Sequence, residues 1–170
     1  MDLILIRHGR AEQPSGKSDD SQRSLTAEGR RKLARSLPSL GLFIRNLEKV
    51  QLWSSPMDRA MQTAAVVARL FGIEGIKTCD FAADGDFAAL LSALNDIRPS
   101  STVIVVGHEP ILSDWSYQLC GLQLPFKKGA AACIRISNLD PIEADLDWFF
   151  QPKLLSRMGE TLLGNRVGRT

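Results

Sequence analysis

The sequence predicts an α/β fold, namely a three-layer α/β/α sandwich around a mostly parallel sheet. Residues 2–7 and 102–106 are continuous apolar and β-branched runs, which are typical of parallel strands buried on both faces. Strand-like and helix-like segments alternate along the chain, as they do in sheets covered by helices on both sides. With 170 residues and 44% hydrophobic content, the chain suits a single domain spanning residues 1–170.

The first half of the chain contains the most regular helical pattern. Its expected elements are strands at residues 2–7 and 50–53, a polar loop at 12–24, and helices at 26–37 and 56–71. The first helix stops before Pro38, because proline interrupts a helix. In the second helix, apolar side chains recur every three or four residues, Pro56 suits the first turn and Gly72 the end.

The second half of the chain alternates shorter segments. Its expected elements are strands at residues 76–79, 102–106, 131–136 and 146–150, and helices at 87–97 and 110–120. The first of these helices ends near Pro99, and Gly121 follows the second. The tail from Leu155 onward has a weak pattern, so no element is predicted there, and residues 164–170 are expected to be mobile.

Composition and charge exclude several classes of protein. The net charge of +2 and the lack of a long basic run argue against nucleic acid binding, and Arg30-Arg31-Lys32 is interpreted as a solvated helix face. No signal peptide and no apolar stretch of about 20 residues is present, so we expect a cytoplasmic protein without membrane contact. Its three cysteines are widely spaced, which favours reduced, buried thiols over disulfides or a zinc site.

The only two histidines of the chain each follow a predicted buried strand. His8 follows the strand at 2–7 and precedes Gly9, and His108 follows the strand at 102–106 and Gly107. Ligands of open α/β sheets bind at the carboxyl ends of the strands, and Gly9 permits close approach of a ligand. Each histidine taken alone also fits a structural role, bonded to a carbonyl or capping a helix.

A third strand end adds an arginine. The strand at 50–53 leads into Ser54-Ser55-Pro56, and the helix that follows offers free N–H groups and a positive dipole end to an anion. Arg59 lies in its first turn, where a cation needs a partner. That partner is either the neighbouring Asp58 or a bound phosphate, which arginine holds with two parallel hydrogen bonds. Thr63 shares a helix face with Arg59 and supports it.

These segments together carry a family resemblance. Arg7-His8-Gly9, the stretch from Ser54 to Ala64, and Val106-Gly107-His108 resemble the motifs of the histidine phosphatase superfamily, the phosphoglycerate mutase-like group. The short chain and Pro152-Lys153 after a late strand most resemble its small phosphohistidine phosphatase branch. The resemblance implies the phosphoglycerate mutase-like fold, no cofactor and no metal. It also implies a nucleophile at His8, with Arg7, Arg59 and His108 around the phosphoryl oxygens and Gly9 in the substrate-binding set.

The resemblance leaves the proton donor open. Larger mutase-like members use an acid on a loop after the second helix, but residues 80–86 contain no glutamate. Asp84 and Asp86 are the candidates for this role, although a turn aspartate and a helix cap at Asp86 account for them equally well. Glu12 and Glu109 are weaker candidates.

The resulting hypothesis is a metal-independent phosphatase that works through a phosphohistidine on His8. Nearby arginines favour the neutral, nucleophilic form of that ring. The sequence contains no clear proton donor, and an alkoxide leaving group needs one more than the imidazole of phosphohistidine does. This favours a phosphorylated protein, specifically phosphohistidine, over a small phosphoester as the substrate. The alternatives are a phosphomonoesterase or mutase acting on a small metabolite, and a phosphate- or phosphoprotein-binding module with little catalysis. A metallophosphatase is disfavoured, since two histidines without a carboxylate cluster give too few ligands.

Overall fold

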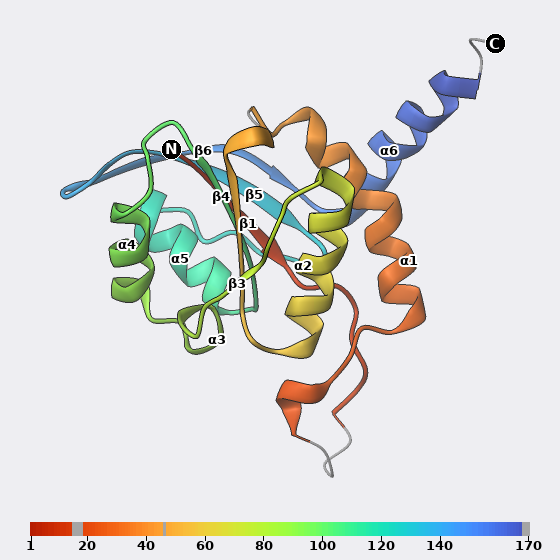
Figure 1. Ribbon diagram of the computed structural model, residues 1–170, viewed down its shortest axis with the longest axis horizontal. Helices are drawn as coiled ribbons and strands as arrows, with labels where there is room; N and C mark the ends of the chain where they lie inside the picture. Colours follow the sequence, from red (N-terminus) through yellow and green to blue (C-terminus); the bar gives the residue numbers. More distant parts are fainter. Residues whose placement is uncertain (15–18, 46, 168–170) are drawn as a thin grey trace.

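A six-stranded sheet forms the centre of the computed structural model, which describes residues 1–14, 19–45 and 47–167 (Figure 1). Its strands are β1 (Asp2–Arg7), β2 (Val50–Ser54), β3 (Lys77–Thr78), β4 (Thr102–Gly107), β5 (Ala131–Leu139) and β6 (Ile142–Phe150). They lie in the order β3-β2-β4-β1-β5-β6, with the first four parallel. β5 pairs antiparallel with both β1 and β6. The predicted fold class is confirmed.

Helices cover both faces of this sheet. α1 (Ala27–Ser36), α2 (Asp58–Phe71) and α6 (Pro152–Val167) pack on one face, and α3 (Phe81–Asp84), α4 (Phe87–Asn95) and α5 (Ile111–Cys120) on the other. Three short 3₁₀ helices complete the described elements: η1 (Asp20–Gln22), η2 (Leu37–Leu42) and η3 (Leu47–Lys49). α2 begins two residues later than predicted, and Pro56 precedes it. Gly72 and Gly121 end α2 and α5 with φ angles of 63° and 72°, a conformation that favours glycine.

The alternation of side chains along β1 explains its unbroken apolar run. Leu3 and Leu5 pack against the α3–α5 layer, whereas Ile4 and Ile6 pack against the α1, α2 and α6 layer. β4 alternates in the same way between the two cores. Because both faces of the sheet are buried, a polar side chain at any of these positions would enter one of the two cores and lose its hydration.

The connections out of β1 and β4 place the end of the sheet that carries the histidines. These strands are neighbours, with Arg7 opposite Gly107. β1 leads toward α1 on one face and β4 leads to α5 on the other face, so the chain diverges where the two strands end. Such a divergence opens a crevice at the carboxyl edge of a parallel sheet, and His8 and His108 both stand at it.

The prediction of no element in the tail is wrong. Residues Pro152–Val167 form α6, which packs against α1 through the fully buried Leu155 and the close approach of Gly159 to Arg35 (Figure 1). Of the residues expected to be mobile, 164–167 lie in α6, and 168–170 lie outside the described residues. Tertiary packing, rather than a regular apolar stripe, stabilises this helix.

The three cysteines of the chain form no disulfide. Cys79 and Cys133 are buried and Cys120 is half-buried, and all three are free thiols. Burial raises the pKa of Cys133 to about 12, so this thiol stays protonated and inert.

Within the described ranges, no helix combines the length and apolar character needed to cross a membrane.

Candidate active site

His8 is held at the end of β1 with one ring nitrogen committed to the backbone. Its Nδ1 lies 2.7 Å from the carbonyl oxygen of Gly9. Because a carbonyl can only accept, Nδ1 carries the proton and Nε2 keeps its lone pair. The N–H of Gly9 donates to Thr63 Oγ1 at 3.1 Å, and that hydroxyl donates to the Arg59 carbonyl at 2.7 Å. The turn that bears His8 is thus tied to the first turns of α2.

His108 lies beside His8, with the ring centroids 5.0 Å apart and the planes inclined at 53°. Its Nε2 is 2.8 Å from Ser55 Oγ, which also accepts the N–H of Met57 at 3.3 Å. A serine hydroxyl that accepts from the backbone can still donate its own proton, and Nε2 of His108 can accept it when the ring proton is on Nδ1. In that arrangement Nδ1 of His108 carries a proton. This nitrogen is buried and has no partner among the described residues, so it can donate to a phosphoryl oxygen.

Both imidazole rings are neutral at pH 7. Burial lowers the pKa of His8 to about 3, aided by the nearby charges of His108, Arg59 and Arg7 and opposed by the bond to the Gly9 carbonyl. Burial likewise lowers the pKa of His108 to about 4, with Arg59 acting in the same direction and Asp20 against it. A neutral ring with a free Nε2 lone pair is the form in which histidine acts as a nucleophile.

Arg59 binds an aspartate that sequence reasoning did not identify. The residue is only 5% exposed, and its two terminal nitrogens donate to the carbonyl and the carboxylate of Asp20 at 2.7 and 2.9 Å. Arg23 binds the other carboxylate oxygen of Asp20 at 2.7 Å. These bonds, that of Arg23 first, hold the pKa of Asp20 below its usual range. The carboxylate partner of Arg59 is therefore Asp20, from the polar loop, rather than Asp58.

Arg7 is positioned by the segment that precedes β5. One terminal nitrogen donates to the Phe126 carbonyl at 2.6 Å, and the backbone of Arg7 bonds to Gly129 and Ala130. Glu109 organises this segment, because its carboxylate accepts the N–H of Phe126 at 3.0 Å and the hydroxyl of Ser113 at 2.7 Å. Burial lowers the pKa of Arg7, and Glu109 opposes that shift. Glu109, a weaker candidate for the proton donor, therefore supports Arg7 in the structure.

Three buried donors around His8 have no partner among the described residues: Arg7 Nε, Arg59 Nε and His108 Nδ1. They come from different elements, and all three residues act electrostatically on the His8 ring. Leaving a buried N–H unpaired costs about 1–3 kcal/mol, so an anion that accepts hydrogen bonds from these groups would bind favourably. A phosphoryl group, with several charged oxygens, matches such a set of donors.

The candidate acids are engaged elsewhere. Asp84 Oδ1 accepts the N–H of Asp86 at 3.0 Å, and Asp86 caps α4 by accepting the N–H of Ala89 at 2.9 Å. Glu12 accepts the N–H of Ser24 at 3.3 Å. Within the described part of the chain, neither Asp84 nor Asp86 bonds to the four site residues. The capping role considered for Asp86 is the one the structure shows.

A metal-binding arrangement is not found in the part of the chain that the structure describes, where no three His, Cys, Asp or Glu side chains are grouped to hold an ion. The polar groups at this site are mainly donors rather than acceptors. Their chemistry suits a negatively charged ligand.

The fold is shared with known phosphatases. The protein histidine phosphatase SixA, in complex with tungstate, aligns with a TM-score of 0.73 and 22% identity over 91% of this chain and 99% of that one. The putative phosphohistidine phosphatase SixA from Agrobacterium tumefaciens aligns with a TM-score of 0.70 and 20% identity, over 89% of this chain and 97% of that one. A mycobacterial glucosyl-3-phosphoglycerate phosphatase in complex with inorganic phosphate aligns with a TM-score of 0.67 and 15% identity, over 89% of this chain and 98% of that one.

Sequence comparisons agree with this likeness. An uncharacterized protein of Picosynechococcus sp. is 31% identical over 157 residues, which is 86% of this chain and 92% of the relative. The sequence model of the histidine phosphatase superfamily (branch 1) matches residues 3–82, which include Arg7, His8 and Arg59. The chain belongs to the histidine phosphatase superfamily.

Proposed function

We propose that this protein removes phosphoryl groups from phosphohistidine in proteins through a covalent phosphohistidine on His8. The observation that carries the proposal is the state of His8. It is neutral and buried, its Nδ1 is committed to the Gly9 carbonyl, and its Nε2 is free beside His108 and the two arginines. Phosphatases of known structure that share the fold include the protein histidine phosphatase SixA.

The reaction needs two in-line displacements. In the first, His8 Nε2 attacks phosphorus, the phosphorus–nitrogen bond of the substrate breaks, and the leaving imidazole takes up a proton from water. Arg7, Arg59 and His108 donate hydrogen bonds to the phosphoryl oxygens, where negative charge spreads in the transition state. In the second, water attacks the phosphorus on His8, which releases inorganic phosphate and a proton and restores the free ring. Side chains supply the positive charge, so no metal takes part.

The engaged carboxylates favour a phosphoramidate over an ester. Asp84, Asp86, Glu12 and Glu109 each accept a backbone N–H, and the lowered pKa of Asp20 keeps that group ionised at neutral pH. In the part of the chain that the structure describes, none of these carboxylates is hydrogen-bonded to His8. A phosphorylated imidazole can leave after taking a proton from solvent, whereas an alkoxide depends on a positioned acid.

A substrate panel with a His8→Ala control tests the proposal. We expect a chemically phosphorylated phosphohistidine protein to be hydrolysed faster than p-nitrophenyl phosphate or 3-phosphoglycerate, with full activity in a chelator. Loss of the nucleophile should lower turnover by about 10³-fold or more and abolish acid-labile phosphate labelling of the protein. Faster hydrolysis of the small esters would indicate a metabolite phosphatase. Phosphoryl transfer between positions of 3-phosphoglycerate would indicate a mutase, and phosphate binding without turnover a binding module.

A further inference from the structure

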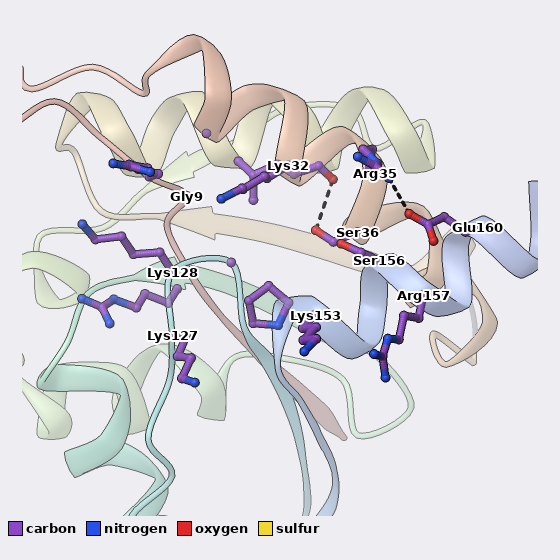
Figure 2. Close-up of a pocket in the computed structure, with 16 residues that line it drawn as sticks. Gly9, Lys32, Arg35, Ser36, Lys127, Lys128, Lys153, Ser156, Arg157 and Glu160 are labelled. Atoms are coloured by element: carbon purple, nitrogen blue, oxygen red, sulfur yellow. Dashed lines mark hydrogen bonds and ion pairs between the residues drawn. The ribbon is translucent and has the colours of Figure 1, made fainter.

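A groove of about 720 Å³ lies next to the candidate active site, between α1, α6 and the loop at residues 127–129 (Figure 2). Arg7, which belongs to the site, is among the lining residues. Figure 2 shows Gly9 on one side of the groove and Arg157 and Glu160 on α6, away from it. Because Arg7 belongs both to the groove and to the site, a ligand in the groove lies beside the reacting phosphoryl group.

The groove concentrates positive charge. We call it the basic groove, since eight cationic side chains line it: Arg7, Arg10, Lys32, Arg35, Lys127, Lys128, Lys153 and Arg157. Its lining contains one carboxylate, that of Glu160, which pairs with Arg35. The chain as a whole has 21 basic and 19 acidic residues, so this excess is local. The N-terminus of α6 also faces the groove at Pro152 and adds the positive end of the helix dipole.

Much of this charge is not neutralised by the protein itself. Arg10 and Lys32 share the carboxylate of Glu28. Four other cations of the basic groove have no carboxylate within ion-pair distance in the described ranges, namely Lys127, Lys128, Lys153 and Arg157. Burial lowers the pKa of Lys128, and the charges of Arg7, Arg23, Arg10 and Arg59 lower it further. An anionic ligand would relieve this mutual repulsion.

We propose that the basic groove binds an acidic segment of the phosphoprotein substrate, next to the phosphorylated residue, and thereby selects substrates by charge. This inference rests on the proposed function. The cations stand on both walls of the groove, and all except Arg7 are on long exposed side chains, which suits an acidic polypeptide more than a small rigid ligand. The lining residues include no aromatic side chain on which bases could stack, which disfavours single-stranded nucleic acid.

Paired peptides test the proposal. A phosphohistidine peptide flanked by Glu and Asp should have a kcat/KM about tenfold higher at low salt than the same peptide with Gln and Asn. The difference should shrink as ionic strength rises, because salt screens exposed charges. The variant Lys153→Glu/Arg157→Glu should bring the ratio of the two kcat/KM values close to one. The control Arg69→Glu/Arg98→Glu makes the same change in net charge at exposed residues outside the groove and should keep the ratio.

The outcomes separate the groove from the chemistry. Equal kcat/KM for both peptides, or an unchanged ratio in the groove variant, would overturn the groove proposal and leave the proposed function intact. If neither phosphohistidine peptide is hydrolysed but p-nitrophenyl phosphate is, the proposed function fails instead. The groove is then judged by fluorescence anisotropy of an unphosphorylated Glu-rich peptide with the His8→Ala protein. Tighter binding of oligo-dT or inositol hexakisphosphate than of this peptide would refute an acidic polypeptide as the occupant.

Discussion

Two imidazoles and two guanidinium groups share the site, and burial affects them differently. The arginines keep their charge, whereas the pKa values of His8 and His108, about 3 and 4, leave the rings neutral. The backbone carbonyl of Gly9 fixes the proton of His8 on Nδ1. In the proposed mechanism, His8 therefore needs no general base in the ground state, and the surrounding donors would bind the phosphoryl oxygens.

A titration of the two histidines checks this distribution of charge. Since the chain has only two, their Cε1–H signals in NMR spectra can be assigned with the His8→Ala variant. We expect neither signal to titrate between about pH 5.5 and 8, where an ordinary histidine would. The unfolded chain protonates near pH 6.5 and the folded one does so near 4 and 3. Stability should therefore fall as the pH drops through that interval. A midpoint near 6.5 for either ring would contradict the assignment.

The sequence predicted that Arg7, His8, Arg59 and His108 come together at one edge of the sheet, but it did not predict their supporting contacts. His8 and His108 follow apolar strands, and Arg59 opens a periodic helix, so pattern alone located them. Asp20 lies in a polar loop without periodicity, and its bond to Arg59 spans 39 residues. A contact of that kind depends on how the loop folds over the sheet edge, which local pattern does not encode. In the sequence, the only indication of this contact was the pair of opposite charges at Asp20 and Arg23 in that loop.

Among the elements, α6 shows most clearly what pattern misses. It has no pronounced apolar stripe, and its stability depends on where it packs. Leu155 is fully buried, and a Cβ placed on Gly159 would lie 2.6 Å from the carbonyl oxygen of Arg35 on α1. The two helices therefore approach each other closely only because this position lacks a side chain. By contrast, α2 and α5 were predicted from apolar spacing and terminal glycines.

Substitution of Gly159 tests that packing. In an exposed helix, Gly→Ala would stabilise by up to about 1 kcal/mol through helix propensity. Here Gly159→Ala should instead destabilise by about 1–3 kcal/mol, because the added methyl group forces α6 away from α1. Chemical denaturation measures the difference, with Thr161→Ala on the exposed side of α6 as the control. Stabilisation by Gly159→Ala would show that the helices do not pack as described.

At the scale of the whole molecule, the site depends on segments far apart in the chain. β1 supplies Arg7 and is followed by His8, α2 supplies Arg59, β4 is followed by His108, and the segment before β5 positions Arg7. An anion bound to all of them connects both helical layers and the sheet. The unfolded chain offers no such site, so an anion that binds here stabilises the whole fold.

Thermal unfolding with an oxyanion tests this coupling. Tungstate at about 100 times its Kd should raise the Tm by about 5–10 °C, from the linkage energy and the size of the domain. The same addition to an Arg59→Ala variant should produce a much smaller increase, whatever the Tm of that variant alone. Arg98→Ala, which lies outside the site, should respond like the wild type. An equal increase in all three proteins would place the anion elsewhere.

The pairing of β1 with β4 also has a consequence for how the protein is made. His8, the proposed nucleophile, is synthesised well before the partners of its strand: β4 begins at Thr102, and the segment that binds Arg7 follows near residue 126. A nascent or truncated chain that ends before these residues carries His8, Arg7 and Arg59, but it lacks His108 and the segment that positions Arg7. In the proposed mechanism, turnover therefore requires that synthesis has passed the segment near residue 126.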